Sequence, residues 1–151
     1  MLWGGRFSEK TDEAALRFSS SFRFDFELME EDIKVSSAHA EMLAKTGIIS
    51  VDEAANIKAG LAAILGEWKS GAWKPGQDDF EDVHSAIESR LFEKIGTDAG
   101  RLHSGRSRND LVASSFKLWI KKASESLSES IKTLQMLVLS IAESHTETIM
   151  P

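Results

Sequence analysis

The chain has 151 residues, of which 24 are acidic and 18 basic, and its formal net charge of −6 disfavours binding to nucleic acid or to an anionic membrane. The absence of cysteine excludes disulfides, thiol catalysis and thiolate metal ligands. Hydrophobic residues make up 42% of the sequence, but the start lacks the apolar segment of a signal peptide and no apolar run is long enough to span a bilayer. We therefore expect a cytoplasmic protein with neither nucleic acid nor membrane as a partner.

The sequence predicts an all-α fold, because it has only two prolines and no strand-like alternation of any length. A short helix is expected from a cap at Thr11 to Phe18, with acidic residues in its first turn. Three phenylalanines then alternate with charged residues over 22–26. This pattern suits either a brief extended segment or a packed turn.

Two longer helices are expected next. From Glu27 to Lys45 the apolar residues are spaced imperfectly but helically, and Gly47 follows as a stop. The apolar stripe of this helix is expected to consist of Leu28, Ile33, Val35, Ala38, Met42 and Leu43. Ser50 and Glu53 have the spacing of a capping box, so a second helix should begin there and end at Gly71.

Four carboxylates and His84 crowd the start of the next expected helix, which runs from Asp78 to a stop at Gly96. Carboxylates in a first turn are stabilised by the helix dipole, and that structural role accounts for most of them. The functional alternative is a carboxylate paired with His84 for proton handling. A hard-metal site is disfavoured because all five ionisable groups come from one segment. His39 and His145 have no such neighbours and are interpreted as surface or boundary residues.

The stretch 103–110, His-Ser-Gly-Arg-Ser-Arg-Asn-Asp, leads into the longest amphipathic pattern and is where we expect the functional site. Gly105 allows a tight turn, and Ser107 or Asn109 can cap the following helix. Arg106 and Arg108 add forked donors near a helix N-terminus, which together suit a carboxylate or phosphate. The competing interpretation is a solvated, capped helix start without a ligand.

The last expected helix carries apolar residues at steps of three and four from Val112 to Ile141. At 1.5 Å per residue, more than 30 residues span roughly 50 Å, so the apolar face needs other helices to pack against. Those helices come either from other subunits or from a later part of a longer chain. The lack of a cap or tail at Met150-Pro151 favours the longer chain.

Three motifs carry a resemblance to a known family: LWGGRF at 2–7, EDVH at 81–84 and HSGRSRND at 103–110. On these motifs the chain resembles the argininosuccinate lyases, members of the fumarase and aspartase superfamily. Two positions depart from the family pattern. Ser104 stands where Thr is usual and keeps a hydroxyl, whereas Leu111 replaces a usual Gln and removes a polar group from the helix start.

The resemblance implies an anti elimination that cleaves argininosuccinate into arginine and fumarate without a cofactor or a metal. It implies substrate binding by Ser21, Ser107, Arg108 and Asn109, and acidic side chains at the pocket from Asp25 and Asp82. Arg106 and His84, singled out from the sequence itself, complete the candidate set. The runner-up activities are another lyase of the superfamily, such as one acting on adenylosuccinate, and a non-catalytic helical assembly module like the lyase-derived proteins of the lens.

The resemblance also implies an organisation. Residues 1–108 would form an N-terminal helical domain and 109–151 the first long helix of a central bundle, within a homotetramer in which three subunits contribute to each active site. The family's catalytic histidine motif would begin after Pro151 and its catalytic serine lies later still. We therefore expect no catalytic residue in this chain and no activity from it alone.

Overall fold

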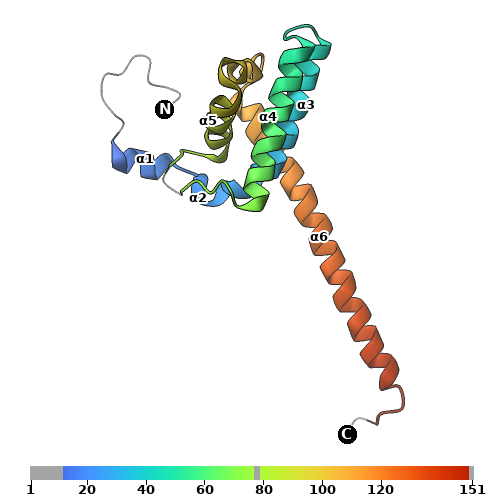
Figure 1. Cartoon of the computed structure of the whole chain (residues 1–151). Helices are drawn as coiled ribbons and strands as arrows, with labels where there is room; N and C mark the ends of the chain where they lie inside the picture. The colour runs from blue at the N-terminus through green and yellow to red at the C-terminus, as the bar shows by residue number, and fades with distance from the viewer. Residues whose placement is uncertain (1–11, 77–78, 150–151) are drawn as a thin grey trace. The chain divides into compact units, whose positions relative to one another are not determined.

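The computed structural model describes residues 12–76 and 79–149, and within these ranges every regular element is helical (Figure 1). This confirms the all-α prediction for the described part of the chain. Thr11, Asp78, Met150-Pro151 and the motif at 2–7 lie outside it. The elements are α1 (Glu13–Ser19), α2 (Phe22–Asp25), the 3₁₀ helix η1 (Phe26–Leu28), α3 (Met29–Lys45), α4 (Val51–Ser70), α5 (Val83–Ile95), the 3₁₀ helix η2 (Gly96–His103) and α6 (Arg108–Ser144).

The chain divides into two compact units, Met1–Phe116 and Lys117–Pro151. In the first unit α3 and α4 lie side by side and α5 packs against both (Figure 1). Their facing side chains form one apolar core. Its largest fully buried apolar side chains are Met29, Leu43, Ile57, Leu61, Ile64, Val83, Ile87 and Leu91.

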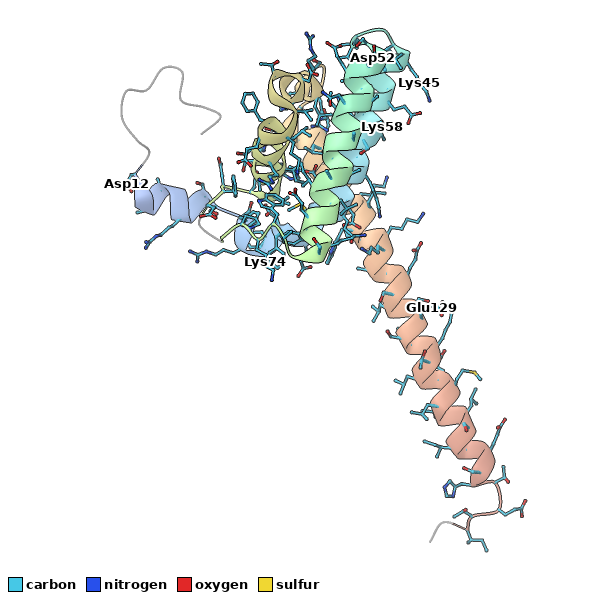
Figure 2. All side chains as sticks on the ribbon, viewed as in Figure 1. Asp12, Lys45, Asp52, Lys58, Lys74 and Glu129 are labelled. Atoms are coloured by element: carbon cyan, nitrogen blue, oxygen red, sulfur yellow. The ribbon has the colours of Figure 1, made fainter. Side chains whose placement is uncertain are left out.

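Helix α4 begins and ends where the sequence predicts. Ser50 Oγ accepts a hydrogen bond from the backbone N–H of Glu53 at 3.1 Å, and Glu53 Oε2 accepts one from Ser50 N–H at 2.7 Å, so the capping box is present. Gly71 ends the helix in the left-handed conformation, with φ 72°. On the surface, Lys45 of α3 and Lys58 of α4 both form ion pairs with Glu41, at 2.9 and 3.4 Å. Figure 2 labels these two lysines on the neighbouring helices.

The predicted stripe of α3 is partly wrong. Ala38 and Met42 are exposed, whereas Ile33 and Leu43 are buried as expected. The buried face instead includes two polar residues at helical spacing, Asp32 and Ser36, each 1% exposed.

The segment 22–28 is helical, so the extended alternative is wrong. It forms one turn of α2 followed by η1. Backbone N–H groups of Ser21 and Phe22 donate to the carbonyl oxygen of Glu81, at 2.8 and 3.3 Å. This contact with a distant part of the chain favours the packed arrangement over an extended segment, which the local alternation alone could not show.

Helix α5 begins later than predicted, at Val83. Asp82 is its N-cap, in an extended backbone conformation, so Asp79 and Glu81 precede the helix and its first turn holds no acidic residue. The dipole argument for those two carboxylates is therefore wrong. The 3₁₀ helix η2 that follows was not predicted.

The unit Lys117–Pro151 contains most of α6, whose bounds confirm the predicted long helix. Beyond Ala123 its apolar side chains are all exposed. The most regular members of this face are Leu127, Ile131, Leu134, Val138 and Ile141. No helix in the described residues has the length and apolar character needed to cross a membrane. The domain boundary expected after residue 108 stays a prediction.

Candidate functional site

Asp82 is the centre of the predicted site. Its carboxylate accepts a hydrogen bond from the backbone N–H of Ser85 at 2.7 Å, which caps α5. The guanidinium of Arg108 donates to the same carboxylate through Nε, at 3.1 Å, and through Nη2. Two parallel hydrogen bonds of this kind define the geometry of the pair tightly. The side chains of Arg108 and Asp82 are 22% and 16% exposed.

The pKa of Asp82 lies below its ordinary value of 3.8. Burial alone would raise this pKa, but the hydrogen bonds from Ser85 and the positive charge of Arg108 outweigh that effect. Asp82 is therefore a carboxylate at neutral pH. It holds Arg108 in place rather than handling protons.

Ser21 and Asp25 lie beside Asp82 at the start of α5. Ser21 Oγ donates to Asp25 Oδ2 at 2.5 Å, and the backbone N–H of Val83 donates to Asp25 Oδ1 at 3.0 Å. Burial raises the pKa of Asp25 above 3.8, although both of these hydrogen bonds oppose the shift. The fold thus brings Ser21, Asp25, Asp82 and Arg108 together from three separate segments.

His84 is paired with a carboxylate, but not with one from its own segment. It is 3% exposed, and its Nδ1 is hydrogen-bonded to Oδ2 of Asp32 on α3. A carboxylate–imidazole pair therefore exists, between two helices. No group of three or more potential metal ligands among His, Cys, Asp and Glu occurs in the part of the chain that the structure describes.

Arg106 connects to the same buried pair. Its Nη1 donates to Ser36 Oγ at 3.2 Å, and Ser36 Oγ donates to Asp32 Oδ1 at 3.0 Å. Burial lowers the pKa of Arg106, while the charges of Asp32 and Glu88 oppose the shift. An arginine remains cationic despite such a shift.

Ser107 and Asn109 are exposed at the start of α6. Ser107 Oγ accepts from the backbone N–H of Asn109 at 3.2 Å, and Asp110 Oδ2 accepts from the N–H of Ser107 at 3.2 Å. Gly105 allows the turn before them with φ 63°, a conformation that favours glycine. The predicted cap is thus Ser107, and the helix start is capped by its own side chains. Both interpretations of this stretch share that feature, so anion binding here stays a prediction.

Sequence reasoning missed Asp32, Ser36 and His39. His39 is half-buried, as its interpretation as a boundary residue expected, but the loop contact of its Nε2, hydrogen-bonded to the carbonyl oxygen of Ser104 at 3.0 Å, was not predicted. The available signal was that Asp32 and Ser36 occupy apolar-stripe positions of α3, one helical turn apart. Polar residues there require buried partners.

The fold and this arrangement define an all-α protein with its polar groups gathered around the starts of α5 and α6. Residues 5–151 match the family described as lyase, and the chain belongs to that family. Among named relatives it is 49% identical over 148 residues to the argininosuccinate lyase of Dehalococcoides mccartyi, covering 97% of this chain and 32% of that protein. It is 45% identical over 150 residues to the argininosuccinate lyase of Chlamydomonas reinhardtii, and 44% identical over 151 residues to that of Neisseria meningitidis serogroup C. These two matches each cover 99% of this chain and 32% of the relative, so the chain spans about a third of its relatives' length.

Proposed function

We propose that the chain is the N-terminal part of an argininosuccinate lyase and supplies substrate-binding residues to its active site. The observation that carries the proposal is the gathering of Ser21, Asp82 and Arg108 around the start of α5, together with identities of 44–49% to proteins of that name. The expected reaction is an anti elimination that releases fumarate and arginine. We propose no cofactor or metal for it.

Arg108 has a donor available for a substrate carboxylate. Nε and Nη2 are held by Asp82, and within the described residues Nη1 has no hydrogen-bond partner. In the elimination, negative charge spreads onto a carboxylate as the carbanion forms. A guanidinium already fixed by Asp82 stabilises that charge without having to reorganise during the reaction.

The exposed side chains of Ser107 and Asn109 add neutral donors at the start of α6. Hydroxyl and amide groups complement a charged clamp because they fix orientation without adding charge. Asp25 and Asp82 would face the positively charged arginine end of the substrate. His84 supports this arrangement from the interior.

The proton-transfer groups are expected outside this chain, in the remaining two thirds of a longer polypeptide and in neighbouring subunits. The proposed assembly is a cytoplasmic homotetramer. Accordingly, we expect the 151-residue chain to bind argininosuccinate weakly and to release no fumarate from it.

The test is a hybrid in which this chain replaces the matching residues of the Dehalococcoides mccartyi enzyme. Fumarate release is followed by ultraviolet absorbance with argininosuccinate and, separately, with adenylosuccinate. Release from argininosuccinate alone supports the proposal. Release from adenylosuccinate instead would assign the runner-up activity.

One observation favours the non-catalytic alternative, a helical assembly module. The apolar residues of α6 beyond Ala123 are exposed, as an assembly surface would be. A folded hybrid that assembles but cleaves neither substrate would support that alternative.

A further inference from the structure

Four polar side chains form a connected path through the interior of the first unit. The path runs from His84 on α5 to Asp32 and Ser36 on α3 and ends at Arg106 before α6. His84 is 3% exposed, and Asp32 and Ser36 are each 1% exposed. Polar groups this deeply buried cost stability unless each finds its partners, so the path requires a specific role.

The direction of the hydrogen bonds follows from the chemistry of the groups. A carboxylate only accepts, so the single hydroxyl proton of Ser36 is donated to Asp32. The oxygen of Ser36 then has only lone pairs to offer, and it accepts from Nη1 of Arg106. Ser36 therefore links a cation to a buried anion that does not contact it directly.

Arg106 also has a donor that the described residues leave unsatisfied. Its Nε is buried and has no hydrogen-bond partner among them. A buried unsatisfied donor on a cation is costly unless a ligand or water meets it. The guanidinium is thus anchored at one nitrogen and unpartnered at another.

We propose that Asp32 and Ser36 are positioning residues that hold Arg106 as a second carboxylate-binding group beside Arg108. This inference rests on the proposed function, because it names the part of the same site that binds the substrate's acidic half. Asp32 supplies the charge that keeps the guanidinium in place, and His84 holds Asp32 from the opposite side. Fixing Arg106 also fixes the backbone that leads into Ser107.

Positioning is tested first on the chain itself, by NMR of the arginine side-chain Nε–H signals, with Arg106 assigned through Arg106→Lys. Ser36→Ala should move the Arg106 signal towards that of a free arginine and speed its exchange with water, while Ser36→Thr, which keeps the hydroxyl, retains the original signal. Ser115→Ala is the matched control, because Ser115 is fully buried and its Oγ has no hydrogen-bond partner among the described residues. An Arg106 signal unchanged in Ser36→Ala would overturn the inference. If Ser36→Ala does not fold, Ser36→Cys, which keeps the volume and weakens the hydrogen bonds, is read in the same way.

The functional part is tested in the hybrid enzyme. Ser36→Ala should raise KM for argininosuccinate about tenfold, the size expected for loss of a charged hydrogen bond, and Ser115→Ala should not. In an Arg106→Ala background, Ser36→Ala should cause no further rise in KM, because each change alone already removes the same hydrogen bond between Arg106 and Ser36. If the hybrid is active and the increases in KM from Ser36→Ala and Arg106→Ala multiply in the double variant, the positioning role is refuted and the proposed function stands. An inactive but folded hybrid would refute the proposed function, while the NMR result still decides the positioning of Arg106.

Discussion

Asp82 combines two roles in one carboxylate, since it caps α5 and pairs with Arg108. Asparagine caps a helix about as well as aspartate but cannot form an ion pair. Asp82→Asn therefore separates the two roles. Asp82→Asn and Arg108→Ala each remove the ion pair from one side, so together they show what the pair contributes to stability and to substrate binding.

Asp82→Asn should lower the free energy of unfolding by about 1.5–3 kcal/mol at neutral pH, as expected for loss of charged hydrogen bonds. Because the pKa of Asp82 is lowered below 3.8 in the folded state, its contribution is present above that pH and is lost as pH falls through the folded pKa. Urea unfolding of both proteins across this range should show the difference shrinking in acid. Asp52→Asn, an exposed first-turn acid of α4, should change stability by only about 0.3–1 kcal/mol. A pH-independent difference for Asp82→Asn would show that the ion pair adds no stability.

Arg108→Ala in the hybrid enzyme should raise KM and lower kcat, reducing kcat/KM by about 10- to 100-fold. The reason is the loss of a fixed donor to a charged carboxylate. Arg101→Ala is the control, because Arg101 pairs with Glu53 at 2.8 Å through a side chain that is 54% exposed. If KM and kcat are unchanged in Arg108→Ala, the stretch 103–110 is a capped helix start that binds no ligand.

Helix bounds were predicted correctly where side chains close in sequence satisfy the free backbone groups at the ends of the helix. Ser50 with Glu53 begins α4 and Gly71 ends it, and these signals are local. The elements that were missed, α2 and η2, are short, and α2 follows backbone hydrogen bonds to the distant Glu81. The features of the candidate site were predictable on the same basis, namely where they depend on residues close in sequence. Ser107 as a cap was predictable, whereas the pairing of Asp32 with His84 depends on how α3 packs against α5.

The packing of α4 on α5 depends on a close approach at Gly60. A Cβ at this position would lie 2.6 Å from Cδ1 of Leu91 and 3.1 Å from Cγ2 of Ile95, and Leu91 is fully buried. At Gly66 of the same helix nothing lies within 4 Å of an added Cβ. The two glycines therefore give a matched test of packing against helix propensity.

Gly66→Ala should raise the free energy of unfolding by about 0.5–1 kcal/mol, because alanine loses less backbone entropy on forming a helix. Gly60→Ala gains the same propensity but overpacks the interface at a cost of about 1–3 kcal/mol, so it should be the less stable of the two variants by that amount. Thermal or urea unfolding measures both. Equal stabilisation by the two substitutions would mean that Leu91 can move aside and that α4 and α5 are loosely packed.

The second unit, Lys117–Pro151, has a regular apolar face that no other part of the described chain is seen to cover. Its regular apolar face has exposed fractions of 62% at Leu127, 60% at Leu134 and 53% at Ile141. The steps of four and three residues along this face are those of helices that pack together in bundles. A face of this kind is stabilised when it is buried against other helices, which fits the proposed tetramer.

Leu127→Glu in the hybrid should therefore shift the sedimentation coefficient from the proposed tetramer towards smaller species. Placing a charge in a buried helix interface is costly, whereas the same charge on a solvated face is tolerated. Ser128→Glu is the control, because it adds an identical charge about 100° further around the same helix, on a residue that is also exposed. Activity should fall together with assembly if several subunits complete each site. A tetramer that persists in Leu127→Glu would show that this face lies outside the subunit contacts, and the non-catalytic assembly alternative would lose its supporting observation.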